Sequence, residues 1–339
     1  MCMHLANVMP YSLGVNPLYK AAITMTRYQI DHFNSLETCP PINPKMSESI
    51  QLDVQAIASI YPHHDNEAEL NVVVGQIQHR ADLIKLWDIK PGEHILEIGC
   101  GQGDCTVTLA NAIGERGHIT AVDPAPLDYG SPYTLGEAHD HLLSSSIGPR
   151  MSFVEANPIT FLNSTSNRYT TAVIAHCIWY FSSPQALQDI LKILSTRADR
   201  ICIAEWALTT QDFRAFPHVL SALTQSALEC RKTESQSNIR TVLSPKAIRQ
   251  SALTAGLTIQ KEDIVTPNEG MLDGSWETSS VLSSQFEEEL SQYVKDERER
   301  SVIVAMRDSV CASRDSVKAQ NEKVKSMDVW VSTFIASST

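Results

Sequence analysis

Hydrophobic positions along the chain follow two spacings, one typical of helices and one typical of strands. In residues 67–87, apolar side chains recur at three- and four-residue steps, which predicts a helix that leads into the core. Further along, short apolar runs bounded by turn residues predict strands, and the longer runs between them predict helices. The predicted strands are residues 94–98, 119–122, 151–155, 171–175, 200–205, 257–264 and 327–334. The predicted helices after the first are residues 106–113, 134–144, 185–194, 213–232 and 244–255.

This alternation is typical of βαβ units and predicts an α/β fold with a mostly parallel sheet. Two mostly helical insertions, at about residues 207–240 and 267–325, depart from it. The apolar residues of the second that fall on one helical face are Leu290, Val294, Val302, Met306 and Val310. If the last strand runs antiparallel beside the sixth, both insertions leave the carboxyl end of the sheet, where open α/β sheets bind ligands. We therefore expect them to cover the ligand site.

One predicted strand-to-helix turn carries most of the candidate chemistry. It contains three closely spaced glycines, Gly99, Gly101 and Gly103. Glycine lets the backbone turn tightly and approach a ligand, but this spacing differs from the Gly-x-Gly-x-x-Gly of dinucleotide sites. Glu97 sets a carboxylate beside the turn, which repels a pyrophosphate and attracts an ammonium group. Because Asp123 ends the next strand, where an acid accepts hydrogen bonds from ribose hydroxyls, the motif favours a nucleoside that carries an amino acid.

The pattern Glu97-x-Gly99-x-Gly101-x-Gly103 with Asp123 resembles motifs I and II of class I methyltransferases, over about residues 83–205. The resemblance implies a Rossmann-like, seven-stranded sheet with helices on both faces, and S-adenosylmethionine as cofactor. It also implies a methyltransferase domain over residues 67–339, preceded by an extension or lid over residues 1–66. The two helical insertions would then form the acceptor pocket. The chain is also similar to methyltransferase-like proteins common in fungi, many of them tied to secondary metabolism.

The same resemblance assigns the cofactor contacts. Motif I residues are expected around the methionine moiety and Asp123 at the ribose. The adenine is expected after the third strand, where this chain has Asn157 and the family more often has Asp. The segment around Tyr61 resembles one that closes over the methionine end, although it also reads as a surface turn. The implied cofactor-binding residues are Tyr61, Glu97, Gly99, Cys100, Gly101, Gln102, Asp123, Pro124, Asn157, Pro158, His176 and Cys177.

Further candidates follow the fourth and fifth strands. His176 suits a general base, because imidazole titrates near neutral pH, but it also suits a structural histidine beneath the cofactor. Trp179 and Tyr180 suit a clamp on a flat acceptor by stacking or cation–π contact, or simply core packing. Trp206 and Arg240 are candidates to face the acceptor, with a structural role as the alternative for each.

The charge and cysteine pattern of the chain limit the classes of partner and metal site that we expect. The 339 residues carry a formal net charge of −12 without a basic run, which argues against a nucleic-acid partner and an acidic membrane surface. The eight cysteines form no Cys-x-x-Cys pair or Cys/His cluster, so no metal site is expected. No secretory signal or membrane-length apolar run is present, so we expect a cytoplasmic protein. Oligomeric state is not indicated.

The function expected from the sequence is methyl transfer to a small organic acceptor at O, N, S or activated C. Two alternatives stay open. In one, the cofactor is bound but not consumed, and its positive sulfur assists a cyclisation or elimination. In the other, the protein is a non-catalytic regulator that senses the cofactor and binds a protein partner.

Overall fold

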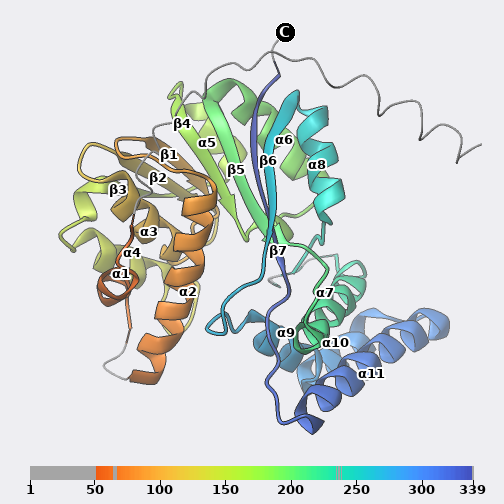
Figure 1. The fold of residues 1–339 in the computed structure, drawn as a ribbon. Coiled ribbons are helices and arrows are strands. Elements are labelled where there is room, and N and C mark those ends of the chain that lie inside the picture. Colours follow the sequence, from red (N-terminus) through yellow and green to blue (C-terminus); the bar gives the residue numbers. More distant parts are fainter. Residues whose placement is uncertain (1–50, 64–66, 234, 236, 238, 338–339) are drawn as a thin grey trace, which may run out of the picture. The chain divides into compact units, whose positions relative to one another are not determined.

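The structure of the protein is a computed structural model, shown in Figure 1, which describes residues 51–63, 67–233, 235, 237 and 239–337. These residues belong to one compact unit, Ser49–Thr339. Most of the predicted extension, residues 1–66, lies outside the described residues. Its described part contains helix α1 (Val54–Ile60), which Asp53 caps by accepting a hydrogen bond from a backbone N–H, and which packs against the next helix.

A single seven-stranded sheet has the order β3-β2-β1-β4-β5-β7-β6. Its strands are β1 (His94–Ile98), β2 (His118–Asp123), β3 (Met151–Glu155), β4 (Tyr169–Ala175), β5 (Ala198–Trp206), β6 (Leu257–Val265) and β7 (Val329–Ala336). β7 is antiparallel to both β5 and β6, and the other neighbouring strands are parallel. The predicted mostly parallel, seven-stranded sheet is therefore confirmed. Its strand order reverses between β1 and β4, the place where open sheets bind ligands.

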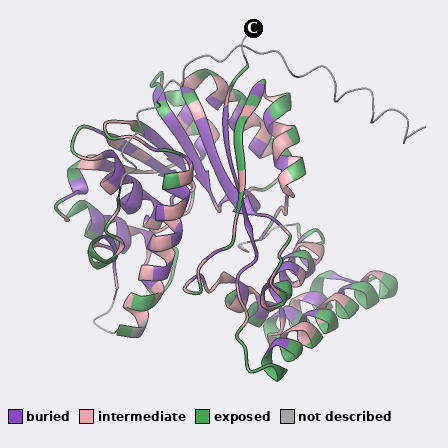
Figure 2. Cartoon of the chain, viewed as in Figure 1, coloured by how far each residue is buried: buried purple, intermediate pink, exposed green. Residues whose placement is uncertain are grey.

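Helices cover both faces of the sheet. They are α2 (Glu67–Leu86), α3 (Asp104–Ile113), α4 (Leu135–Leu143), α5 (Pro158–Ser164), α6 (Pro184–Arg197) and α8 (Pro245–Thr254), with short 3₁₀ turns η2 (Gly148–Arg150) and η3 (Ile178–Tyr180). α1, α2 and α3 pack on one another, and α6 packs on α5 and α8. Strands β1 and β4 are almost wholly buried, as Figure 2 shows, because helices exclude water from both of their faces.

The two insertions form a separate helical group beyond the carboxyl ends of β5 and β6. This group contains η4 (Phe213–Ala215), α7 (Phe216–Glu229), α9 (Asp273–Val281), α10 (Ser284–Tyr293) and α11 (Glu297–Ala319). α7 packs against α9 and α11 (Figure 1). The group has its own small hydrophobic core, which includes Leu228, Val281 and Phe286. The helices of the two insertions therefore pack around a hydrophobic core that is separate from the core of the sheet.

One prediction about the second insertion is wrong. The second insertion was expected to have a single apolar helical face made of Leu290, Val294, Val302, Met306 and Val310, but the helix breaks after α10. Asp296 caps the start of α11 by accepting hydrogen bonds from two backbone N–H groups. The break changes the register of the apolar positions, so Ile303 is buried in place of Val302, which is 58% exposed. An acid that can cap a helix outweighed the apolar periodicity here.

Candidate functional site

The glycine loop between β1 and α3 is built as the motif predicts. Gly99, Gly101 and Gly103 all have positive φ, which favours residues without a Cβ atom. At Gly99 a side chain is also excluded by space, because a Cβ there would lie 2.6 Å from Cys177 Sγ. The Cys177 thiol donates a hydrogen bond to Ile98 O, and this contact holds the end of β4 against the loop.

Asp123, at the end of β2, holds the middle of this loop. One of its carboxylate oxygens accepts a hydrogen bond from the Gly101 N–H (2.9 Å), and the other accepts one from the Ala125 N–H (2.9 Å). On the other side, His139 Nε2 donates to Gly101 O, and its ring stacks on Phe153 with centroids 3.9 Å apart. The loop is therefore fixed from two directions, and the Asp123 carboxylate lies beside it.

Glu97 lies beneath the loop. Its carboxylate is 1% exposed and accepts a short hydrogen bond from the Thr106 hydroxyl on α3. Burial raises the pKa of Glu97 to about 7, against the opposing effect of the Thr106 hydrogen bond. In this arrangement Glu97 joins the strand to the helix that follows the loop.

Tyr61 and Gln102 meet at the same edge of the sheet. The Tyr61 hydroxyl lies 3.5 Å from Gln102 Oε1, and the Gln102 amide donates to Tyr133 O. Burial raises the pKa of the Tyr61 phenol, so it is neutral and acts as a donor. Two predicted cofactor residues, 41 positions apart in the chain, are thus brought together.

A cluster of aromatic rings fills the space after β4 and β5. His176 follows β4 in a left-handed backbone conformation with φ 52°, and its N–H donates to Ala204 O. Its Nε2 lies 2.9 Å from His79 Nε2 on α2, and its ring packs on Trp206 with centroids 4.5 Å apart. The far side of the Trp206 ring meets the edge of His218 on α7. The cluster therefore joins α2, the sheet edge and the first helical insertion.

The Glu205 carboxylate organises the two loops beside this cluster. Its two oxygens accept hydrogen bonds from the Ile178 and Trp206 N–H groups, both at 2.9 Å. Oε1 also lies 3.8 Å from His176 Nδ1. Burial raises the pKa of Glu205 to about 7, partly offset by the backbone donors. Burial lowers the pKa of His176 well below its usual value, so the imidazole is neutral near pH 7.

An ion pair connects α2 to the start of α3. Arg80 Nε donates to Asp104 Oδ2 at 2.8 Å, and the two side chains are 12% and 21% exposed. Arg80 Nη1 is buried and has no hydrogen-bond partner among the described residues. A buried guanidinium N–H without an acceptor is costly, and the same part of the fold contains Asp273 Oδ2, which is likewise buried without a partner among these residues.

Comparisons with known proteins agree with this geometry. A family model described as Protein-L-isoaspartate(D-aspartate) O-methyltransferase matches residues 53–128, which include the glycine loop and Asp123. Methyltransferase phomM of Diaporthe leptostromiformis is 27% identical over 307 residues, covering 72% of this chain and 79% of that protein. The 2-phytyl-1,4-naphtoquinone methyltransferase of Nostoc sp. is 27% identical over 175 residues, covering 50% of this chain and 71% of that protein.

A solved structure extends the match to most of the chain. A cyclopropane-fatty-acyl-phospholipid synthase-like protein from Lactobacillus casei superposes with a TM-score of 0.72 and 27% sequence identity. The superposition covers 83% of this chain and 98% of that one. Together these matches support a class I, Rossmann-like methyltransferase.

The residues predicted on the adenine side follow β3, next to Asp123. Ala156 N–H donates to Asp123 O, which places Asn157 beside the end of β2. The Asn157 side-chain oxygen accepts hydrogen bonds from two backbone N–H groups and caps α5, and Pro158 is the first residue of that helix. Asn is therefore explained locally as a helix cap. Pro124 is exposed at the same edge.

The predicted acceptor residues divide into two groups. Trp206 lies in the ring cluster, and Tyr180 is 46% exposed at the end of η3. Trp179 is instead 2% exposed and donates its indole N–H to Leu243 O in the core. The Arg240 guanidinium is exposed and donates to Ser237 O, while its backbone N–H is bonded to Trp179 O. These hydrogen bonds of Trp179 and Arg240 connect η3 to the end of the first insertion.

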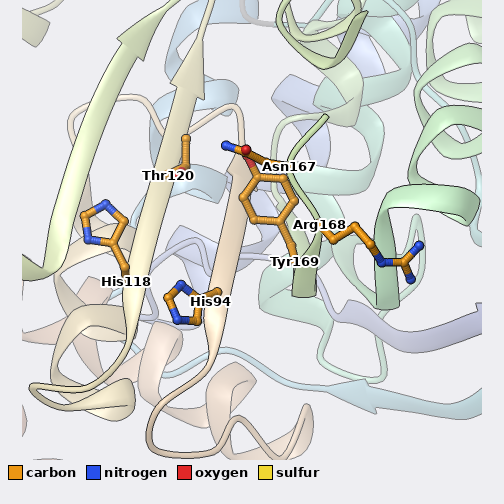
Figure 3. Close-up of a pocket in the computed structure, with 6 residues that line it drawn as sticks. All are labelled: His94, His118, Thr120, Asn167, Arg168 and Tyr169. Atoms are coloured by element: carbon orange, nitrogen blue, oxygen red, sulfur yellow. The ribbon is translucent and has the colours of Figure 1, made fainter. Parts of the chain in front are cut away.

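A surface hollow of about 230 Å³ lies at the opposite edge of the sheet, where β1, β2 and β4 begin. Figure 3 shows its lining residues, which are His94, His118, Thr120, Asn167, Arg168 and Tyr169. The Arg168 guanidinium points away from the hollow and pairs with Asp199 (Figure 3). Because strands of this fold bind ligands at their carboxyl ends, we do not assign the active site of the methyltransferase to this hollow.

Four residues of the site were not predicted from the sequence: His79, Arg80, Glu205 and His218. The available signal was a His-Arg pair inside an apolar helix and an acid at the end of a buried strand.

Within the described part of the chain, no helix is long and apolar enough to cross a membrane. The same residues contain no group of three His, Cys, Asp or Glu side chains able to hold a metal ion.

Proposed function

We propose that this methyltransferase uses S-adenosylmethionine and transfers its methyl group to O, N, S or activated C of a small organic acceptor, as an EC 2.1.1 enzyme. The observation that carries the proposal is the glycine loop bonded to Asp123 at the carboxyl edge of the sheet. A secondary-metabolite acceptor is part of the proposal and is supported by the similarity to the fungal methyltransferase phomM.

The residues at this edge fit the cofactor. The orphaned Arg80 Nη1 suits the methionine carboxylate, because a buried guanidinium N–H needs an anionic acceptor. The Asp123 carboxylate, which already accepts two backbone N–H groups, keeps lone pairs for ribose hydroxyls. The backbone of Gly99 and Gly101 would lie along the methionine moiety, and Asn157 near the adenine.

When bound, the cofactor supplies a methyl group on a positively charged sulfur. The work of the chain is then to orient the acceptor and exclude water. Trp206 and the half-exposed Tyr180 would form aromatic walls, and the helical insertions would close over them. His176 lies between the cofactor side and these walls, where a base would stand if the acceptor must lose a proton.

A cytoplasmic location also belongs to the proposal. The described cysteines are free thiols, and four of the six are buried, which suits a reducing compartment.

Calorimetric titration of the full chain with S-adenosylmethionine, and separately with NAD, tests the cofactor. We expect saturable binding of S-adenosylmethionine alone. Accumulation of S-adenosylhomocysteine with an accepted substrate then distinguishes methyl transfer from reactions that leave the cofactor intact. Saturable binding of NAD, with none of S-adenosylmethionine, would refute the proposal.

Asp123→Asn tests the ribose contact. The variant keeps an oxygen for one backbone N–H but loses the charge, so affinity for S-adenosylmethionine should fall about tenfold or more. Asp199→Asn is the matched control, because Asp199 is an exposed acid at the amino end of β5. Equal affinities in the two variants, measured by the same calorimetry, would count against the assigned ribose site.

A further inference from the structure

Two imidazoles buried beside the proposed site form a hydrogen-bonded pair, and the proposed function gives no role to the bond between them. His79 on α2 is 0% exposed, and the His176 side chain is 7% exposed. Their Nε2 atoms are 2.9 Å apart, a hydrogen-bond distance. The Nδ1 atom of each ring is buried and has no hydrogen-bond partner among the described residues. Among the described residues, the bond between the two rings is therefore the one side-chain hydrogen bond that either imidazole makes.

Counting protons limits the pair to two arrangements. Burial, reinforced by the Arg80 charge, lowers the pKa of His79 to about 3, and burial lowers that of His176 well below its usual value. Both rings are therefore neutral near pH 7, and each has one N–H. One N–H must lie between the two Nε2 atoms. Either His176 donates and leaves its own Nδ1 bare, or His79 donates and His176 has its proton on Nδ1.

Glu205 distinguishes these arrangements. Its Oε1 lies 3.8 Å from His176 Nδ1, and both carboxylate oxygens already accept backbone N–H groups. A bare Nδ1 would direct a lone pair at an acceptor oxygen, whereas an Nδ1–H directs a partial positive charge at it. The other titratable groups around the ring are Arg80 on α2 and His218 on α7, and neither supplies a negative charge. The second arrangement is favoured.

We propose that His79 is a positioning residue, which donates its Nε2–H to His176 Nε2 and so fixes His176 in the Nδ1–H tautomer facing Glu205. His176 needs such support, because its backbone is in the left-handed region at φ 52°, which a residue with a side chain seldom adopts. The bond from α2 holds the ring against Trp206, at the boundary between the glycine loop and the insertions. Only the effect on turnover rests on the proposed function.

Nitrogen-detected NMR of the full chain, labelled with ¹⁵N-histidine, tests the tautomer directly. We expect His176, assigned by loss of its signals in His176→Gln, to be the Nδ1–H form. His218 is an internal control for the opposite form, because its Nδ1 accepts the Met327 N–H at 3.0 Å. His139 is a second, because its Nε2 donates to Gly101 O. An Nε2–H form of His176 overturns the proposal, whether or not the chain methylates anything.

Two substitutions at His79 test the consequence for turnover. His79→Gln keeps an amide N–H that can donate to His176, and His79→Leu removes the donor but keeps an apolar side chain in the core. We expect the leucine variant to lose about tenfold in kcat, with KM for S-adenosylmethionine little changed, and the glutamine variant to retain most of it. Equal kcat in the two variants overturns the positioning role. If the leucine variant does not fold, the NMR result on the unmodified chain decides.

Discussion

Gly99 is the loop position with the least tolerance for a side chain. Its φ of 74° and the nearby Cys177, whose Cβ and Sγ would lie 2.5 and 2.6 Å from a new Cβ, act together. Gly101 has a similar positive φ of 51°, but a Cβ there would meet nothing within 4 Å. A side chain at Gly101 would therefore meet backbone strain alone, whereas one at Gly99 would meet both strain and a steric clash.

Gly99→Ala and Gly101→Ala should differ in stability for that reason. Both incur a left-handed strain of about 1 kcal/mol. Only Gly99→Ala also forces the end of β4 to move, which should remove a further ~2 kcal/mol from the free energy of unfolding. Urea unfolding of both variants measures the difference, and equal losses would mean that the Cys177 contact relaxes without cost.

The sequence predicted the glycine loop and Asp123 because their spacing is set locally, by one turn and the strand after it. His79 could not be found in that way, since it meets His176 across 97 positions of the chain. The role of Glu205 could not be predicted for a similar reason. It depends on the loop after β4, whose Ile178 N–H donates to the Glu205 carboxylate. Such contacts arise from tertiary packing, which no local pattern encodes.

Helix α2 and the segment between β6 and α9 come into close backbone contact. Gly75 on α2 faces Gly270, and a Cβ on Gly75 would lie 2.5 Å from Gly270 Cα. Asn268 secures the contact by donating its amide to Gly75 O and accepting the Gly270 N–H. Glycine in the middle of α2, a weakness by helix propensity, is thus explained by an insertion that packs onto the helix carrying His79.

Gly75→Ala has an expected effect opposite in sign to helix propensity. Propensity alone would stabilise the helix by about 1 kcal/mol, but the new Cβ must displace backbone atoms, so we expect a net loss of about 1–2 kcal/mol. Gly270→Ala perturbs the same contact from the other side, and the two losses should be less than additive when combined. Thermal or urea unfolding of the two single variants and of the double variant tests this. A stabilised Gly75→Ala would show that the insertion moves away from α2 without cost.

Strands and helices of the α/β core were predictable because their apolar spacing agrees with how they are buried. Helix α2 was predicted within one residue, and β1 and β3 with their observed bounds. The prediction for the second insertion was wrong where a helix cap interrupts the apolar periodicity. Asp296 starts a new helix there, and Val302 is exposed.

At the scale of the whole molecule, buried titratable groups of two kinds are concentrated at the carboxyl edge of the sheet. Burial lowers the pKa of His79 and of His218 to about 3 each, and holds that of His176 well below its usual range. Burial raises the pKa of Glu97 and of Glu205 to about 7 each. Burial therefore disfavours the charged forms of these five side chains, which suits a site that excludes water.

These shifts predict how stability depends on pH, and the two kinds of group act with opposite sign. His79 and His218 have lower pKa values folded than unfolded, so their contribution is complete above about pH 6.5 and is lost as the pH falls toward about 3. The glutamates contribute below about pH 4.5 and lose that contribution as the pH rises through 7. The effects oppose one another between about pH 4.5 and 6.5, so the histidine-driven loss should be steepest below about 4.5.

His218→Gln, which keeps an acceptor for the Met327 N–H but cannot titrate, should flatten the slope of unfolding free energy against pH by up to ~1.4 kcal/mol per pH unit. Urea unfolding between pH 7 and pH 4 measures both slopes, and parallel curves for the variant and the unmodified chain would mean that His218 is not held neutral by burial.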